Sequence, residues 1–298
     1  MKLLLFIRPF LLLLIASLFG CNSGPQGSVS ETGTLPAIDP DYSDVTIPYN
    51  IAPLNFKIND KASSYFVTIS AGSAKVIGIR TKNGVVRIPE KKWKKLLEGN
   101  KGQDLNIKVF SKDPKSTWKS YKTITDRIAT EPIDPYITYR LLYPGYESWK
   151  EILIKRRELG SFRERSIIEN SVVDENCINC HSYNNNDDSK GFLFHIRGSL
   201  GGTYFSIGND LKKFNLKTKG MKNGAVYPRW HPSGRFVAFS SNKIVQQFHS
   251  ALLKKVEVSD LESSLVLYDI DRNEMMDVKL AGSEKYMDTY PEWSPDGK

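Results

Sequence analysis

The chain has 298 residues, of which 40% are hydrophobic and 25% charged, and its formal net charge is +9 at pH 7. This length is enough for two domains with cores of their own. Basic residues gather at 91–95, 155–165 and 212–222. In a chain that carries an export signal, such clusters favour a solvated face or contact with anionic lipid headgroups, and they argue against a nucleic-acid partner.

The N-terminus has the pattern of an export signal. An apolar run from Phe10 to Phe19 follows basic residues and is too short to span a bilayer, which takes about 20 residues. The run ends in LFGC at 18–21, which resembles the lipobox of bacterial lipoproteins. The resemblance implies a signal peptide over 1–20 and acylation of Cys21. An ordinary signal peptide cleaved elsewhere is the alternative.

Residues 21–50 are expected to form a lipidated flexible linker, because 22–36 are rich in Gly, Ser, Thr and Pro. No second apolar stretch of membrane length follows in the sequence. We therefore expect an exported body in the cell envelope that a lipid holds at a bacterial membrane, facing the periplasm or the cell surface.

Residues 51–130 predict a β-sandwich-like domain. Five segments alternate apolar and polar residues with the period of two that is typical of strands. They are LNFKI at 54–58, YFVTISA at 65–71, KVIGIRT at 75–81, GVVRIP at 84–89 and LNIKVFS at 105–111, with an Asn-Gly hairpin signal at 83–84. One helix is expected at 90–99, with Trp93, Leu96 and Leu97 on one face. The segment contains no recognisable catalytic constellation.

Residues 131–195 are expected to be helix and loop and to present the cysteine motif. Charged, helix-compatible sequence follows an aromatic stretch, and Ile152, Leu153, Arg156 and Leu159 suit a short amphipathic helix. This helical segment leads into CINCH at 177–181.

The pair Cys177 and Cys180, with His181 directly behind, is compatible with four kinds of site. A structural zinc site wants four ligands, which usually come from two separate pairs. A redox dithiol would follow a strand in a βαβ unit, which this sequence lacks. A structural disulfide is possible in an oxidising compartment but leaves His181 unexplained.

Haem c uses all three residues of the motif. The thiols of Cys177 and Cys180 form thioethers with the porphyrin, and the imidazole of His181 is an axial ligand of the iron. The export signal is consistent with this reading, because c-type haem is attached outside the cytoplasm. The sequence therefore favours a covalently bound haem c.

His195 is the candidate second axial ligand, because it follows His181 by fourteen residues and lies among apolar neighbours in FLFHI at 192–196. A core histidine bonded to the backbone is the alternative, and His249 is a weaker candidate. Two histidine ligands would suit electron transfer, whereas one ligand and an open face would suit small-molecule binding or peroxide chemistry.

Residues 196–298 contain an internal repeat. YPRWHPSGR at 227–235 aligns with YPEWSPDGK at 290–298, which predicts a strand that carries the aromatic residues, a Pro-x-Gly turn and a buried strand. The repeat resembles that of TolB-type β-propellers and implies a propeller fold. A propeller needs at least four blades, and the sequence stops inside a turn, so we expect a partial, truncated propeller.

Several segments together resemble a family of TolB-like or cytochrome c-like lipoproteins from Bacteroidetes-type bacteria. They are VTIPYNIAPLNFKI at 45–58, ENCINCHSY at 175–183, FLFHIRG at 192–198 and YPRWHPSGRFVAFSSNK at 227–243. The resemblance implies an N-terminal β-domain, a haem-attachment motif and propeller repeats in a mainly β chain, and it supplies no catalytic residues.

Two functions are therefore expected of the chain. The first is a membrane-tethered haem c protein for electron transfer or redox sensing. The alternative is a non-redox, TolB-like scaffold that binds another cell-envelope protein or a glycan. Hydrolase motifs such as GxSxG and HExxH are absent from the sequence, so the reading leans away from an enzyme.

Overall fold

The computed structural model describes residues 24–114, 117–142, 151–187, 189–208, 210–219, 221, 223–250, 256–278 and 286–298. The signal peptide expected at 1–20 and the acylation expected at Cys21 lie outside them. The described chain is mainly β, and none of its helices is long and apolar enough to cross a membrane. It divides into two compact units, one formed by Met1–Ile137 with Arg157–Arg163 and the other by Thr138–Arg156 with Glu164–Lys298.

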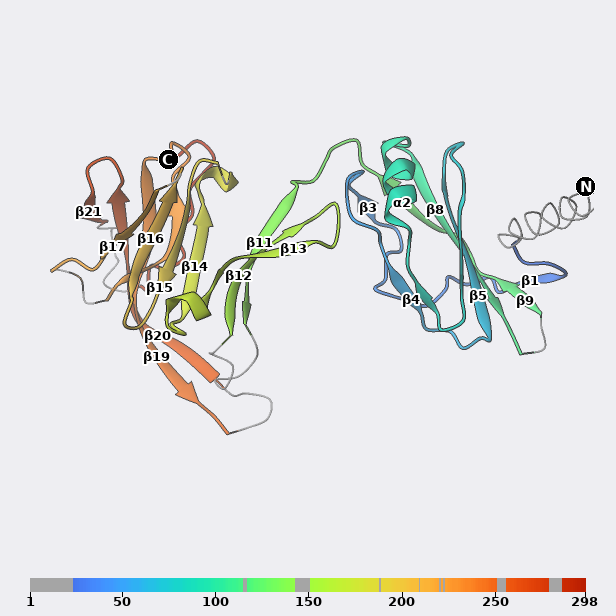
Figure 1. Ribbon diagram of the computed structural model, residues 1–298, viewed down its shortest axis with the longest axis horizontal. Coiled ribbons are helices and arrows are strands. Elements are labelled where there is room, and N and C mark those ends of the chain that lie inside the picture. The colour runs from blue at the N-terminus through green and yellow to red at the C-terminus, as the bar shows by residue number, and fades with distance from the viewer. Residues whose placement is uncertain are drawn as a thin grey trace, which may run out of the picture. The chain divides into compact units, whose positions relative to one another are not determined.

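The N-terminal unit contains two sheets (Figure 1). The larger consists of β1 (Val29–Glu31), β3 (Thr46–Ile47), β5 (Ser64–Ala71), β6 (Ile77–Thr81), β8 (Asp104–Lys112), β9 (Trp118–Ser120) and β10 (Ile124–Ile128). Its order is β1-β9-β8-β10-β3, with β5 paired to β8 and β6 to β5. The smaller sheet joins β2 (Ile38–Asp39), β4 (Phe56–Ile58) and β7 (Val85–Val86) in the order β2-β4-β7.

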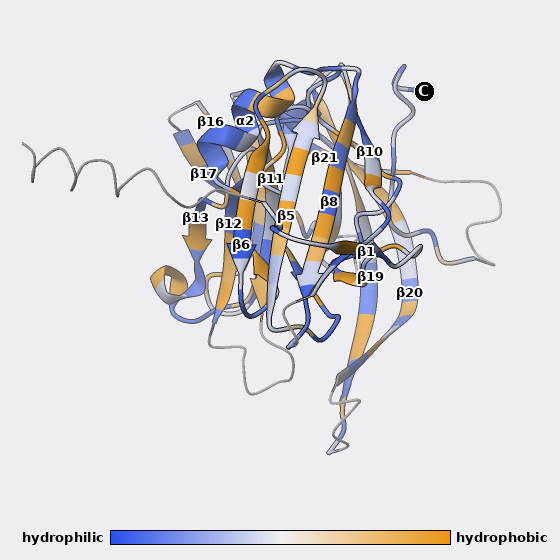
Figure 2. Cartoon of the chain, turned by 90° about the vertical axis from the view of Figure 1, so that its right-hand side faces the viewer, coloured by the Kyte–Doolittle hydropathy of each residue, from blue (hydrophilic) through white to orange (hydrophobic). Residues whose placement is uncertain are grey.

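One hydrophobic core lies between these sheets and the helix α2 (Glu90–Glu98). Hydrophobic residues recur along β5 and β8 between more hydrophilic ones (Figure 2), and Val67 pairs with Val109 across the two strands, both fully buried. Trp93 of α2 is also fully buried, and its indole N–H donates to the Ile51 carbonyl at 3.0 Å. The strands expected from the period of two and the expected helix are therefore confirmed.

The Asn-Gly signal at 83–84 marks a turn, but not the hairpin that the sequence predicts. Before the turn β6 pairs with β5, and after it β7 pairs with β4 of the other sheet. Gly84 has φ +78°, and its carbonyl accepts the Ile58 N–H at 2.9 Å. Positive φ suits glycine, so the Asn-Gly pair correctly predicts a turn. The strands with which β6 and β7 pair are determined by the hydrophobic core.

Gly84→Ala is expected to destabilise the N-terminal unit. A β-carbon at this position would lie 2.6 Å from the Ile58 carbonyl oxygen, which belongs to the backbone and cannot rotate away. Together with the left-handed φ, this should cost about 1–3 kcal/mol in the free energy of unfolding, measured by urea denaturation. Gly33 has φ +72° and open space around it, so Gly33→Ala is the matched control. Equal losses in the two variants would contradict the contact with Ile58.

Residues 29–50 differ from the flexible linker expected over 21–50. β1 pairs in parallel with β9, and β3 pairs in parallel with β10. The side chains of Ile38 and Ile47 are 8% and 5% exposed and join the core. The composition rich in Gly and Ser suggested a linker, but these isolated apolar residues are enough to hold the segment on the sheets.

The C-terminal unit contains most of one three-stranded sheet and two four-stranded sheets, and the four-stranded sheets are antiparallel (Figure 1). The sheet β11-β12-β13 consists of Tyr136–Leu142, Ile152–Glu158 and Glu164–Glu169. The sheet β14-β15-β16-β17 consists of Ile178–Tyr183, Phe192–Ile196, Gly202–Ile207 and Asp210–Phe214. The sheet β18-β19-β20-β21 consists of Ala225–Trp230, Phe236–Phe248, Val256–Asp269 and Glu274–Asp277.

The helix-and-loop segment expected at 131–195 is wrong. Its described residues form β11 to β15, with only two short 3-10 turns, η3 (Asn170–Val173) and η4 (Asn184–Asn186). Ile152 and Ile154 are both buried and lie on one side of β12. Their spacing of two, which fits a strand, prevails over the helical spacing of Ile152 and Arg156.

The strands β15 and β16 are packed on both faces of their sheet. Phe192, Phe194 and Ile196 on one face pack with Ile152 and Ile154 of β12. On the other face, Leu193 and Phe205 pack with residues of the following sheet, among them Trp230, Val237, Phe239 and Tyr268. Trp230 therefore packs between two sheets. The strands β19 and β20 form a long ribbon that stays paired as far as Phe248 and Val256.

Candidate functional site

The CINCH motif lies at the start of β14, an edge strand of its sheet. Asn179 pairs with His195 on β15, and the next pair is Ser182 with Leu193, so that Cys180 and His181 form a β-bulge. Cys180 has φ +50°, in the left-handed region that residues other than glycine seldom adopt. The bulge, rather than the helix-and-loop segment expected there, therefore directs the side chains of Cys180 and His181.

The same bulge recurs in the sequence repeat. The pairing of β18 with β19 shifts between Val226 and Arg229, and Tyr227 there has φ +53°. Tyr290, the first residue of the second repeat copy, has φ +55°. Cys180 thus occupies the position of these two tyrosines, and Tyr183 that of Trp230. The motif strand is an additional copy of the repeat, which the sequence analysis missed because this copy lacks the Pro and Gly signature.

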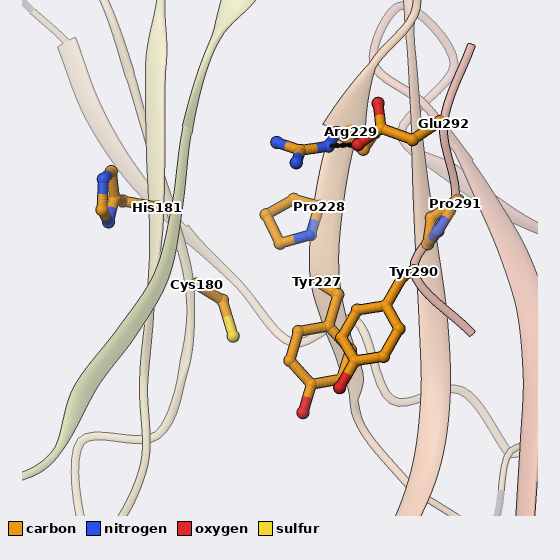
Figure 3. Close-up of a pocket in the computed structure, with 8 residues that line it drawn as sticks. All are labelled: Cys180, His181, Tyr227, Pro228, Arg229, Tyr290, Pro291 and Glu292. Carbon is orange, nitrogen blue, oxygen red and sulfur yellow. Dashed lines mark hydrogen bonds and ion pairs between the residues drawn. The ribbon is translucent and has the colours of Figure 1, made fainter. Parts of the chain in front are cut away.

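The three copies meet at a cavity of about 170 Å³ (Figure 3). Its lining residues are Cys180, His181, Tyr227, Pro228, Arg229, Tyr290, Pro291 and Glu292. The sulfur of Cys180 points toward the tyrosine side of the cavity, while the ring of His181 lies away from the tyrosines (Figure 3). The rings of Tyr227 and Tyr290 pack with their centroids 4.6 Å apart. Arg229 Nε and Glu292 Oε1 lie 2.5 Å apart in an ion pair.

Both thiols of the motif are free of disulfide bonds. Burial raises the pKa of Cys177 and of Cys180, although the nearby guanidinium groups of Arg197 and Arg140 act in the opposite direction. A raised thiol pKa reduces the thiolate fraction that a redox dithiol or a nucleophile needs, so the arrangement argues against both. Burial and a hydrogen bond with Tyr290 raise the pKa of Tyr227 to about 12.

His181 is held as a neutral imidazole. Burial lowers its pKa, so the ring is uncharged at neutral pH and one of its nitrogens keeps a lone pair. Its Nε2 lies 3.4 Å from the Thr138 carbonyl oxygen, a contact in which the nitrogen has to donate. The ring also lies beside Phe192, with the centroids 6.3 Å apart.

His195 is not brought to His181. It pairs with Thr203 across β15 and β16 and lies on the face of the sheet opposite Phe192, the residue that His181 contacts. It also lines a different cavity. His249, the weaker candidate, contacts Glu257 at 3.2 Å on the β19–β20 ribbon. The structure therefore gives no support to a pair of histidine ligands.

His195 should make stability depend on pH. Burial, with the charge of Arg197, lowers its pKa to about 4, against about 6.5 for an unfolded histidine. Between these values the unfolded chain binds more protons, so the free energy of unfolding should fall by at most about 3 kcal/mol as the pH drops from about 6.5 to 4. Urea denaturation at several pH values should show a smaller fall in His195→Gln. The same fall in both proteins would contradict this assignment.

The donors at CINCH suit haem c better than a single metal ion. No group of three or more His, Cys, Asp or Glu converges as for a metal ion anywhere in the described ranges, so zinc gains no support. The donors suit haem c better, because it needs two unpaired thiols and one neutral imidazole rather than a common ligand sphere. The cavity of about 170 Å³ is smaller than the roughly 300–1,000 Å³ of pockets that enclose a ligand, so the described residues would cover a porphyrin only in part.

Comparisons with known proteins do not assign a family. No family model matches the chain, and no curated protein matches it. Among solved structures, a chain from a study of host cell surface retention of a 1.5-MDa bacterial ice-binding adhesin aligns at 11% sequence identity with a TM-score of 0.23. The alignment covers 83% of this chain and 96% of that one. At this TM-score the likeness carries no argument about fold or function.

Proposed function

We propose that the chain is a haem c protein that exchanges electrons or senses redox state in the bacterial cell envelope. One observation carries the proposal: CINCH presents two thiols without a disulfide and a neutral imidazole on one edge strand. This short segment therefore supplies the three donor groups that covalent haem attachment requires.

Each residue of the motif has a distinct part in holding the haem. Cys177 and Cys180 would supply the two thioether sulfurs, and His181 the axial nitrogen. The contact of His181 Nε2 with the Thr138 carbonyl is long, at 3.4 Å, and is easily given up. Arg140 and Arg197, whose charges act on both thiols, would complement the carboxylates of a bound haem. The haem itself supplies exchange of one electron.

We also propose a fold class for each of the two units and a place for the chain in the cell. Two consecutive four-stranded antiparallel sheets and a further copy of the bulge at Tyr290 support a TolB-type β-propeller in the C-terminal unit. The common core of two sheets in the N-terminal unit supports a β-sandwich-like domain. The lipobox-like sequence at 18–21 supports a tether to a membrane through Cys21.

Absorbance spectroscopy tests the haem. The full chain is expressed in a bacterium that attaches c-type haem to exported proteins, and its spectrum is recorded before and after addition of dithionite. We expect a Soret band that shifts on reduction and persists with the chain after denaturation. A colourless protein that folds normally would contradict the proposal.

A second candidate function is a non-redox scaffold that binds another envelope protein or a glycan. The β19–β20 ribbon favours it, because it extends beyond the other strands of its sheet (Figure 1) and exposes Val245 and Val258. Capture of an envelope partner that is unchanged by alanine at Cys177 and Cys180 would support the scaffold. Loss of capture in that variant would instead connect binding to the haem.

A further inference from the structure

A second cavity, of about 290 Å³, lies in the C-terminal unit beside the ends of β15 and β17. Its lining includes Arg197, Lys217, His195 and Thr203, together with four glycines, and it contains no Asp or Glu. None of these residues lines the cavity at Cys180. The volume is close to the lower end of the range for small-molecule pockets, roughly 300 Å³.

The two cations of this cavity have no acidic partner within the part of the chain that the structure describes. Arg197 and Lys217 appear in none of its ion pairs. Arg197 is half-buried, and a cation partly removed from water is costly unless an anion compensates it. The positive charge at this cavity therefore calls for a negatively charged ligand.

Four glycines contribute backbone to the lining of the cavity. Gly198 and Gly202 have φ +100° and +154°, and the Gly201 N–H closes a turn on the Gly198 carbonyl at 3.0 Å. The Asn176 side chain lies against Gly198, and its Oδ1 accepts the Ser199 N–H at 3.2 Å. The turn therefore shapes the wall of the cavity, and the two unpaired cations are the groups suited to an oxyanion.

His195 and Thr203 add a hydrogen-bond donor. His195 Nδ1 lies 3.2 Å from Thr203 Oγ1, and the Thr203 side chain is almost fully buried. If the hydroxyl donates in this contact, the N–H at Nε2 is left to donate to a ligand. If the imidazole donates, the hydroxyl hydrogen is left instead. One donor remains in either case.

We propose that this cavity binds the oxyanion of a small ligand, a phosphate, sulfate or carboxylate group, through Arg197, Lys217 and the donor of the His195–Thr203 pair. None of the residues of this cavity lines the cavity at Cys180. The site is connected to the motif all the same, because the Arg197 N–H donates to the Cys177 carbonyl at 2.9 Å. The oxyanion has two possible sources, a free ligand or the carboxylates of the haem itself.

Gly224 offers a clean substitution for testing the site. A β-carbon there would meet no heavy atom within 4 Å, so a longer side chain can enter the cavity without a clash. Gly224→Asp places a negative charge among the cations, and Gly224→Asn is its neutral counterpart of the same shape. Arg197→Gln removes one cation, and Lys219→Gln is a control in the same loop that lies outside the cavity.

Isothermal titration calorimetry with inorganic phosphate measures the binding, using the full chain with haem attached and the haem-free variant with alanine at Cys177 and Cys180. Circular dichroism shows that each variant is folded. We expect Gly224→Asp and Arg197→Gln to weaken binding at least about tenfold, while Gly224→Asn and Lys219→Gln stay within about twofold of the parent.

The two proteins distinguish the sources of the oxyanion. If the chain with haem attached and the haem-free variant both bind phosphate, the oxyanion comes from a free ligand. If only the haem-free variant binds phosphate, the carboxylates of the haem fill the site in the parent. Absence of phosphate binding in both, or equal affinity in Gly224→Asp and Gly224→Asn, would overturn the proposal. Neither result depends on whether haem is attached, so this site and the haem proposal fail separately.

Discussion

Alanine at both Cys177 and Cys180 is expected to leave the chain without covalently bound haem. Each sulfur would form one thioether, so each single variant should keep at most one covalent bond to the porphyrin and the double variant none. Haem-dependent peroxidase staining on a denaturing gel measures this, because only covalently held haem survives denaturation. The expected change is from full staining in the parent to none in the double variant.

The control for this loss is a histidine outside the motif. His231 contacts the Gly297 carbonyl at 3.0 Å and does not belong to CINCH, so His231→Ala should keep the stain. Both cysteines are only partly buried, and the double variant should therefore fold, which circular dichroism can verify. Staining that persists in the double variant would show that the haem, if bound, is held by other groups.

Phe205→Ala is expected to lower the free energy of unfolding of the C-terminal unit by about 3–5 kcal/mol. Phe205 lies on β16 and is 3% exposed. Its ring contacts Trp230 and Tyr268 of the following sheet, with centroids 5.8 Å and 5.5 Å away. Alanine would leave a cavity where the two sheets pack, so both would lose contacts at once.

Urea denaturation followed by tryptophan fluorescence measures this loss, since Trp230 reports on the same core. Leu211→Ala on the neighbouring strand β17 is the matched control, because Leu211 is 60% exposed and its truncation should change the free energy of unfolding by no more than about 0.5 kcal/mol. A loss of that small size for Phe205→Ala would mean that the two sheets do not share this core.

The sequence predicted strands well where one face of a strand is buried. Along β5 and β8 the period of two matches the observed burial, and Trp93 marks the helix α2 correctly. Pairing partners were not predictable, because the core shared by two sheets decides that β7 joins β4. The segment before the motif failed for a related reason, since Ile152 and Ile154 are buried by residues far along the chain.

The sequence could predict which residues form the candidate haem site, but not how their side chains are arranged. CINCH identifies Cys177, Cys180 and His181, but the left-handed conformation of Cys180 follows from a bulge that the spacing of the cysteines does not reveal. The spacing of 47 residues between Cys180 and Tyr227 was the available signal, because it is close to the ~40–45 residues of a propeller repeat. His195 and His181 are separated because they lie on opposite faces of β15. The sequence does not reveal this arrangement, because it follows from the register of the strands.

Intact-mass spectrometry of the full chain, purified without reductant from a host that attaches c-type haem, tests the central claim most directly. The account predicts one population whose mass exceeds that of the processed chain by one haem, and the loss of that increment in the double cysteine variant. A mass equal to the unmodified chain would contradict it, as would one lower by the two hydrogens of a disulfide between Cys177 and Cys180.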